Sequence, residues 1–119
     1  IMGYETVDLG TDNRETKVDY PDYADKMASW LKKNPEHKGI LICGTGIGMS
    51  IAANRYNHIR AALCKDGLVA ELARLHNDAN VLCIGARVIG TETVKRILTR
   101  FLDTEFEGGR HQFRVEKLG

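Results

Sequence analysis

A short apolar run at residues 40–42 leads into a cysteine, a glycine-rich loop and a stretch of small residues, and this order constrains the fold strongly. The glycines of the loop, Gly44, Gly46 and Gly48, stand at alternate positions. A strand, loop and helix in this order direct several backbone N–H groups toward one point, where they attract an anion. Cys43 lies at the mouth of the loop, where positive potential favours a thiolate.

The spacing of this loop excludes three chemistries that use similar loops. A dinucleotide-binding fingerprint requires a third glycine at the position of Met49, and a Walker-type phosphate loop requires a lysine that the loop lacks. A cysteine phosphatase requires an arginine six positions after its nucleophile, which is again Met49. The remaining functional interpretation is a cysteine base or nucleophile, with backbone amides that stabilise negative charge. The structural alternative is a buried cysteine before a tight turn.

Acidic residues are absent from the segment between His37 and Lys65. If the glycine loop hosts a proton abstraction, Cys43 is therefore the only local base.

Composition limits the class of protein and its partners. The 119 residues suit one domain with one core, and 17 basic against 16 acidic residues favour neither nucleic acid nor an anionic membrane as a partner. The apolar stretch at 40–53 is shorter than the ~20 residues of a membrane span. Cys43, Cys64 and Cys83 form no C-x-x-C pair, which indicates reduced thiols and a cytoplasmic location. The four histidines are far apart in sequence and give no sign of a metal-ligand cluster.

Strand and helix patterns alternate along the chain. They predict an α/β fold with a doubly wound parallel sheet, a three-layer arrangement of the Rossmann-like or flavodoxin-like kind. Helix periodicity places Leu68, Leu72 and Leu75 in the core, and Thr91 suits a helix cap. The predicted strands are 4–9, 40–43, 59–63 and 81–84, and the predicted helices are 21–33, 47–55, 67–76, 91–102 and 110–117.

Ligands of parallel sheets bind at the carboxyl ends of the strands, and Cys43 occupies such an end. Residues 77–80 and 85–87 flank the strand at 81–84, so we expect them to share the crevice beside Cys43. His76 closes the helix before that strand, either as an acid–base group or as a cap for the helix dipole.

Two arginines are candidates for an anion site. Arg110 and Arg114 are four residues apart, so they share a helix face, where like charges repel unless an anion lies between them. Arg87, after a strand end, is a third candidate. Without other evidence, the residues favour the other interpretation, an ordinary solvated charged face.

The sequence closely resembles type B ribose-5-phosphate isomerase, in the family that also contains galactose-6-phosphate isomerase subunits. The resemblance covers essentially the whole chain. The segments that carry it are 19–21 (DYP), 40–54 (ILICGTGIGMSIAAN), 60–62 (RAA), 76–78 (HND), 80–82 (NVL), 85–90 (GARVIG) and 107–116 (EGGRHQFRVE).

The resemblance implies a role for each matching residue. It makes Cys43 the base that moves a proton between C1 and C2 of the sugar, and His76 the acid that assists ring opening. It implies further that Thr45 takes part in catalysis and that the enzyme needs no metal or other cofactor. It also implies a homodimer or tetramer with sites at the dimer interface. The substrate-binding residues that it implies are Gly44, Thr45, Gly46, Ile47, Gly48, Asn77, Arg87, Arg110 and Arg114.

The same resemblance predicts aldose–ketose isomerisation of ribose 5-phosphate and ribulose 5-phosphate, a step of the pentose phosphate pathway. The alternatives are another sugar phosphate, such as galactose 6-phosphate or allose 6-phosphate, and a catalytically silent phosphosugar-binding relative. The family's first strand and most of its first helix have no counterpart here, so residues 1–119 read as a single isomerase domain that lacks its first strand. We expect roughly 20–25 further residues upstream, and a gap between the strands at 4–9 and 40–43.

Overall fold

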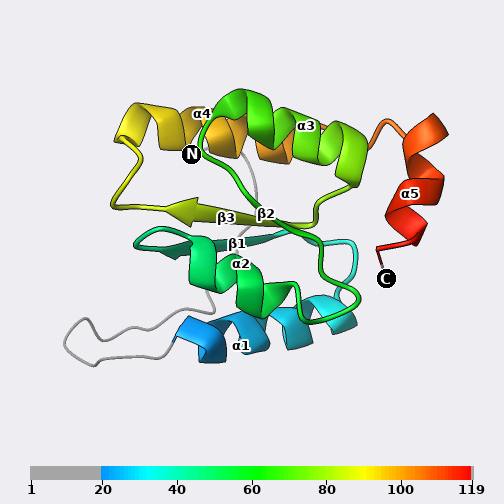
Figure 1. Ribbon diagram of the computed structural model, residues 1–119, viewed down its shortest axis with the longest axis horizontal. Helices are drawn as coiled ribbons and strands as arrows, with labels where there is room; N and C mark the ends of the chain where they lie inside the picture. Colours follow the sequence, from blue (N-terminus) through cyan, green and yellow to red (C-terminus); the bar gives the residue numbers. More distant parts are fainter. Residues whose placement is uncertain (1–19, 119) are drawn as a thin grey trace.

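The computed structural model describes residues 20–118, which form a small parallel sheet covered by helices (Figure 1). The predicted order of strands and helices is confirmed in this range, with most bounds moved by one or two residues. The predicted strand at 4–9, and the gap expected beside it, lie outside the described residues. The strands are β1 (Gly39–Cys43), β2 (Ala61–Leu63) and β3 (Val81–Gly85), and the helices are α1 (Tyr20–Lys33), α2 (Ile47–Ala53), α3 (Gly67–Asn77), α4 (Thr91–Asp103) and α5 (Gln112–Glu116), preceded by the 3-10 turn η1 (Gly109–His111).

Strand β3 is central, with β1 and β2 on either side and all three parallel. The register pairs Gly39 with Val81 at one end of the sheet and Cys43 with Gly85 at the other. Every residue of β3 is buried, because it has a strand on each side and helices on each face. A continuous apolar strand is typical of this position.

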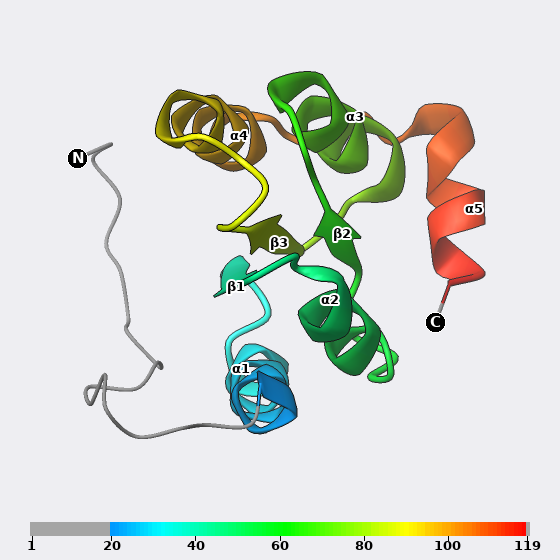
Figure 2. The same ribbon diagram turned by 60° about the vertical axis from the view of Figure 1, so that its left-hand side comes forward.

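The helices form two layers, α1 and α2 on one face of the sheet and α3 and α4 on the other (Figure 2). Alternate residues of β3 supply the two cores, because successive side chains of a strand point to opposite faces. Val81 and Cys83 pack with the buried residues of α1 and α2. Leu82 and Ile84 pack with those of α3 and α4. The three-layer α/β fold predicted from the sequence is thus confirmed.

The predicted buried face of α3 is wrong. Leu68 is 63% exposed and Leu72 is 37% exposed, whereas Ala70 and Ala73 are buried against Phe101 and other apolar residues of α4. The helix carries two apolar stripes, and the stripe of small residues lets α3 approach α4 closely. Leu68 and Leu72 remain on the outer surface of the protein, where they could pack against another protein surface.

Two helix termini also differ from the prediction. Gly90, not Thr91, is the N-cap of α4, and Thr91 is the first helical residue. The segment predicted as one helix at 110–117 is divided into η1, which begins at Gly109 after a turn with positive φ at Gly108, and α5.

The fully buried Phe101 allows a test of this core assignment. We expect Phe101→Ala to lower the free energy of unfolding by about 3 to 5 kcal/mol, because it removes a large side chain and leaves a cavity. Urea denaturation followed by circular dichroism measures the change. Val88→Ala, at a residue 68% exposed, is the control and should change it by less than about 0.5 kcal/mol. Equal effects of the two substitutions would contradict the assignment.

Candidate active site

Cys43 is held at the end of β1 by a loop that lies directly on the end of β3. Gly46 has a φ of 81°, a conformation that favours glycine, and a Cβ there would lie 3.1 Å from the backbone nitrogen of Gly85. A Cβ on Gly85 would in turn collide with the backbone of Thr45. Both glycines are therefore required for this close approach of two backbone segments.

Hydrogen bonds within the loop fix the sulfur atom and the threonine hydroxyl. The Gly46 N–H donates to the Sγ of Cys43 at 3.2 Å, and the Ile47 N–H donates to the Oγ1 of Thr45 at 3.3 Å. Ile47 and Gly48 then begin α2. Cys43 is half-buried, so its thiol remains accessible beside the loop.

Arg87 lies beside the same loop, as predicted. The Ala86 and Arg87 N–H groups donate to the carbonyls of Cys43 at 2.8 Å and Gly44 at 3.0 Å. The Arg87 side chain runs past Gly44, where a Cβ would lie 3.3 Å from its Cδ. The structure therefore brings a thiol, a glycine loop and a guanidinium to one end of the sheet.

The other two cysteines occupy the core, as predicted. Cys64 and Cys83 are fully buried, and burial raises the pKa of Cys64 to about 11 and that of Cys83 to about 12. At neutral pH these two thiols are protonated and shielded.

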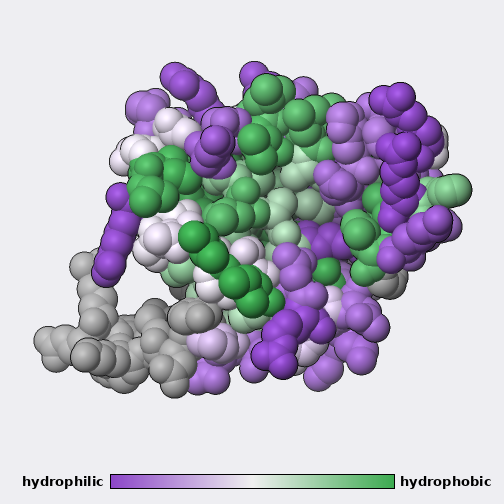
Figure 3. All heavy atoms as spheres, viewed as in Figure 1, coloured by the Kyte–Doolittle hydropathy of each residue, from purple (hydrophilic) through white to green (hydrophobic). Residues whose placement is uncertain are grey.

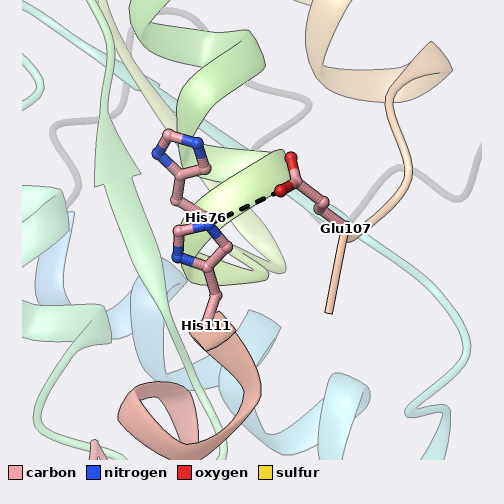
Figure 4. A group of neighbouring side chains, drawn as sticks. All are labelled: His76, Glu107 and His111. Carbon is pink, nitrogen blue, oxygen red and sulfur yellow. Dashed lines mark ion pairs between the residues drawn. The ribbon is translucent and has the colours of Figure 1, made fainter. Parts of the chain in front are cut away.

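A second group of functional side chains surrounds His76 at the end of α3. The His76 and His111 rings stack with centroids 4.3 Å apart and planes inclined by 20° (Figure 4). The Nε2 of His111 lies 3.7 Å from the Oε1 of Glu107 and 3.5 Å from the Nε of Arg110. Burial, together with His76 and Arg110, lowers the pKa of His111, which favours its neutral form.

Asn77 and the two arginines belong to this second group. Asn77 follows His76 as the last residue of α3, and the charges of both Arg110 and Arg114 act on His111. Among the described residues, neither Arg110 nor Arg114 forms an ion pair. Both arginines stay candidates for the predicted anion site, although Arg110 lies in η1 and Arg114 in α5 rather than on one helix as predicted.

The two groups lie at opposite ends of the sheet, which contradicts the expectation of one shared crevice. Cys43 pairs with Gly85, the last residue of β3, whereas His76 and Asn77 precede Val81, its first residue. The length of β3 alone separates the two ends by about 13 Å, at ~3.3 Å per residue. Figure 1 shows the β1–α2 loop at one end of the molecule and α5 at the other. Residues 77–80 come before a parallel strand and so reach its amino end.

Sequence reasoning missed His111 and Glu107. His111 is only 5% exposed, and the cluster of His76, Glu107 and His111 brings one ligand atom from each residue within 4.8 Å of the others. The Glu107–His111 spacing of four residues was a weak signal, but nothing in the sequence linked this pair to His76.

Nitrogen and oxygen ligands of this kind suit a zinc-like cation. The nearly parallel rings do not aim their lone pairs at one point, however, and Arg110 repels a cation.

An apolar face adjoins the cysteine loop. We use this name for Ile47 and Ile51 of α2, Leu63 of β2 and Leu68 of α3, which are all exposed. Figure 3 shows apolar side chains gathered over these elements. Leu63 lies close to Gly46, so the face extends to the loop that holds Cys43.

No helix within residues 20–118 is long and apolar enough to cross a membrane.

A parallel sheet with helices on both faces and a thiol loop at a strand end defines a three-layer α/β protein with its candidate site at that strand end. The sequence profile of the ribose/galactose isomerase family matches residues 1–118. The chain therefore belongs to the ribose/galactose isomerase family and is an isomerase.

Individual relatives agree with this assignment. Ribose-5-phosphate isomerase B of Escherichia coli is 48% identical over 116 residues, which cover 98% of this chain and 77% of that protein. D-erythrulose-4-phosphate isomerase of Pectobacterium atrosepticum is 47% identical over 117 residues, with 98% and 77% covered.

Solved structures share the fold. The crystal structure of a ribose 5-phosphate isomerase from Thermotoga maritima matches with a TM-score of 0.92 and 52% identity, and the match covers 98% of this chain and 79% of that one. Ribose-5-phosphate isomerase B from Mycoplasma genitalium, solved with bound ribulose-5-phosphate, matches with a TM-score of 0.89 and 45% identity, covering 94% and 74%.

The different environments of the three thiols predict selective alkylation. At pH 8 a thiol with a pKa of about 11 is ionised to only about one part in a thousand, so iodoacetamide should modify Cys43 well before Cys64 or Cys83. Peptide mass spectrometry over a time course measures the order. Cys43→Ser is the control and should remain largely unmodified under the same conditions. Modification of Cys64 or Cys83 at the rate of Cys43 would contradict the burial described above.

Proposed function

We propose that this isomerase acts on sugar phosphates and interconverts ribose 5-phosphate and ribulose 5-phosphate, with Cys43 as the base. The observation that carries the proposal is the half-buried Cys43 thiol beside a glycine loop and Arg87. No carboxylate occurs in the sequence between His37 and Lys65 to take its place. The relatives named above, one of them with bound ribulose-5-phosphate, support the class of substrate.

The reaction requires a proton to move between two carbons. The Cys43 thiolate removes the proton from C2 of the open-chain aldose, and the electron pair of that C–H bond forms the cis-enediolate, with negative charge on O1. The hydroxyl proton of O2 then passes to O1, which moves the negative charge to O2. Return of the proton from the Cys43 thiol to C1 gives the ketose as the C2 oxygen becomes a carbonyl, and it regenerates the thiolate. Each well-placed donor to the developing oxyanion lowers the barrier by about 3 kcal/mol.

The loop limits which donors serve this purpose. The amides of Gly46 and Ile47 already have acceptors, in Cys43 and Thr45. In this proposal the enediolate therefore takes its hydrogen bonds from the Gly44, Thr45 and Gly48 amides and from the Thr45 hydroxyl. Arg87 binds the substrate beside them.

The second group of residues completes the chemistry. His76 acts as the acid that opens the sugar ring, and Asn77 holds a sugar hydroxyl. Arg110 and Arg114, which form no ion pair among the described residues, bind the phosphate. Binding of the phosphate, remote from the reacting carbons, holds the sugar in register with Cys43.

One chain does not bring these groups together, so we propose that two copies share each site. Cys43 of one copy would work with His76, Asn77, Arg110 and Arg114 of the other. The apolar face next to the cysteine loop supports this arrangement, because an exposed surface of this kind suits burial against a partner. In a two-fold dimer the same contact occurs twice and gives two sites. Such dimers can associate further into a tetramer.

Substrate length is the main alternative within this class. The Pectobacterium relative is named for a four-carbon sugar phosphate, and six-carbon phosphates remain candidates as well. Initial rates on ribose 5-phosphate, erythrulose 4-phosphate, galactose 6-phosphate and allose 6-phosphate decide between them. A rate on ribose 5-phosphate well below that on another of these would overturn the proposed substrate. A silent phosphosugar-binding relative is disfavoured, because Cys43 and His76 are both present.

We also assign the protein to the cytoplasm and to the pentose phosphate pathway. Three cysteines without a disulfide fit a reducing compartment, and the proposed substrate pair belongs to that pathway.

Removal of the thiol tests the proposed base. We expect Cys43→Ala to lower kcat by about a hundredfold to ten-thousandfold, because no neighbouring carboxylate replaces the thiolate. Binding of the sugar phosphate, measured by calorimetry, should survive, because the arginines are intact. Glu92→Gln, at an exposed residue of α4 that pairs with Lys95, is the control and should keep the wild-type kcat. Substantial turnover by the alanine variant would show that the base lies elsewhere.

A cis–trans comparison tests the shared site. Mixed dimers of Cys43→Ala with His76→Ala chains, purified through two affinity tags, should have about half of the wild-type activity, because one of two sites is intact. Mixed dimers of wild-type chains with Cys43→Ala/His76→Ala double-variant chains should be inactive, because each site then lacks one group. The reverse pattern would place each complete site within one chain.

A further inference from the structure

The turn that follows His76 and Asn77 has an unusual residue at its centre. Asp78 is the C-cap of α3 with φ 47° and ψ 44°, and it is the one non-glycine residue with positive φ in the described part of the chain. Glycine is the usual residue at such a position, because a Cβ disfavours this conformation. A turn alone would not need a carboxylate here.

The carboxylate of Asp78 joins two arginines. Arg74 donates from Nη1 to Oδ1 at 2.9 Å, and Arg60 donates from Nη2 to Oδ2 at 3.3 Å. Arg60 also donates from Nε to the backbone carbonyl of Asp78 at 2.8 Å. Arg74 is only 6% exposed, and a buried guanidinium needs a countercharge. Asp78 supplies it.

The same arginines tie the turn to two other elements. Arg74 donates to the carbonyls of Ala79 at 2.7 Å and Thr104, the C-cap of α4, at 2.9 Å. Arg60 precedes β2 in the chain, and its N–H donates to the side chain of Asn80 at 2.6 Å. The last turn of α3 is thereby fixed against both β2 and the end of α4.

His76 and Asn77 lie between the two ends of this clamp. Arg74 and Asp78 are four residues apart and bracket them in the sequence. On the other side, the Glu107 N–H donates to the carbonyl of Leu75 at 3.2 Å, so the segment that leads to His111 is also fixed to this turn. The His76 ring reaches its stacked position against His111 from this held backbone (Figure 4).

We propose that Asp78 is a positioning residue of the isomerase site, which acts by holding the Arg60–Asp78–Arg74 clamp and thereby orients the His76 ring and the Asn77 amide. This inference rests on the proposed function for its catalytic consequence. Asp78 itself does not touch the substrate in this proposal.

The test uses the full-length chain with two substitutions at Asp78. Asp78→Asn keeps the size and the tolerance of positive φ but removes the charge, and Asp78→Gly removes both the carboxylate and the strain. Both should lower kcat between about tenfold and a hundredfold, because small misplacements of a reacting group cost that much, with KM changed less than about threefold. The signal of the His76 ring in a proton–carbon correlation spectrum should shift in both variants.

Glu71→Gln provides the matched control. Glu71 lies on the same helix and forms an ion pair with Arg100, away from the turn. This variant should keep the wild-type kcat and the wild-type signal of the His76 ring. If the Asp78 variants do not fold, Arg60→Met is the substitute, because it removes only the less buried of the two arginines. It should lower kcat and shift the His76 signal in the same direction, by smaller amounts.

The outcomes separate this inference from the proposed function. A folded Asp78→Asn variant with wild-type kcat, or a lower kcat without any shift of the His76 signal, would overturn the positioning role. Full activity of Asp78→Gly would also overturn it, because the backbone turn would then suffice. A third outcome is that the wild type shows no isomerase activity but the His76 signal still shifts in Asp78→Asn. This result would refute the proposed function and leave the positioning of His76 by Asp78 intact.

Discussion

The contact between the backbones at Gly46 and Gly85 sets the geometry of the cysteine loop. Gly85 is both the last residue of β3 and the register partner of Cys43, so the loop lies on the sheet rather than in solvent. The amides of residues 86 and 87 complete the contact by donating to the carbonyls of Cys43 and Gly44. The sulfur atom is consequently placed by the central strand, which is the most buried element of the fold. A rigid scaffold of this kind is what pre-organised catalysis requires.

Much of the fold and one end of the candidate site follow from local sequence signals. The strand, cysteine, glycine loop and helix are contiguous, so their order alone predicts their arrangement. The apolar run at 81–84 likewise predicts a strand, whereas its central place depends on pairing with both β1 and β2. The inner face of α3 could not be decided in this way, because its leucines and its alanines both recur at helical spacing. The choice depends on how closely α4 approaches, which is a tertiary property.

The other end of the site depends on contacts between distant parts of the chain. His76 and His111 are brought together by the path of residues 104–111 past the end of α3, and no periodic pattern marks that path. The assignment of residues 77–80 to the crevice of Cys43 failed for a simpler reason. In a parallel sheet, the residues before a strand and the residues after it are separated by the whole length of that strand. Sequence proximity to β3 was therefore no guide to which end a side chain reaches.

The separation of the two groups along β3 has a consequence for how the protein behaves at low abundance. If each site needs two chains, a lone chain has no complete site, and the catalytic rate per chain depends on protein concentration. Dilution below the dissociation constant of the pair would remove activity, and on concentrating the protein again activity would return at a rate that is second order in chain concentration. In a cell that makes few copies of this protein, flux through the reaction would then fall more steeply than the number of chains. Flux would depend on expression level as on a threshold and not in linear proportion.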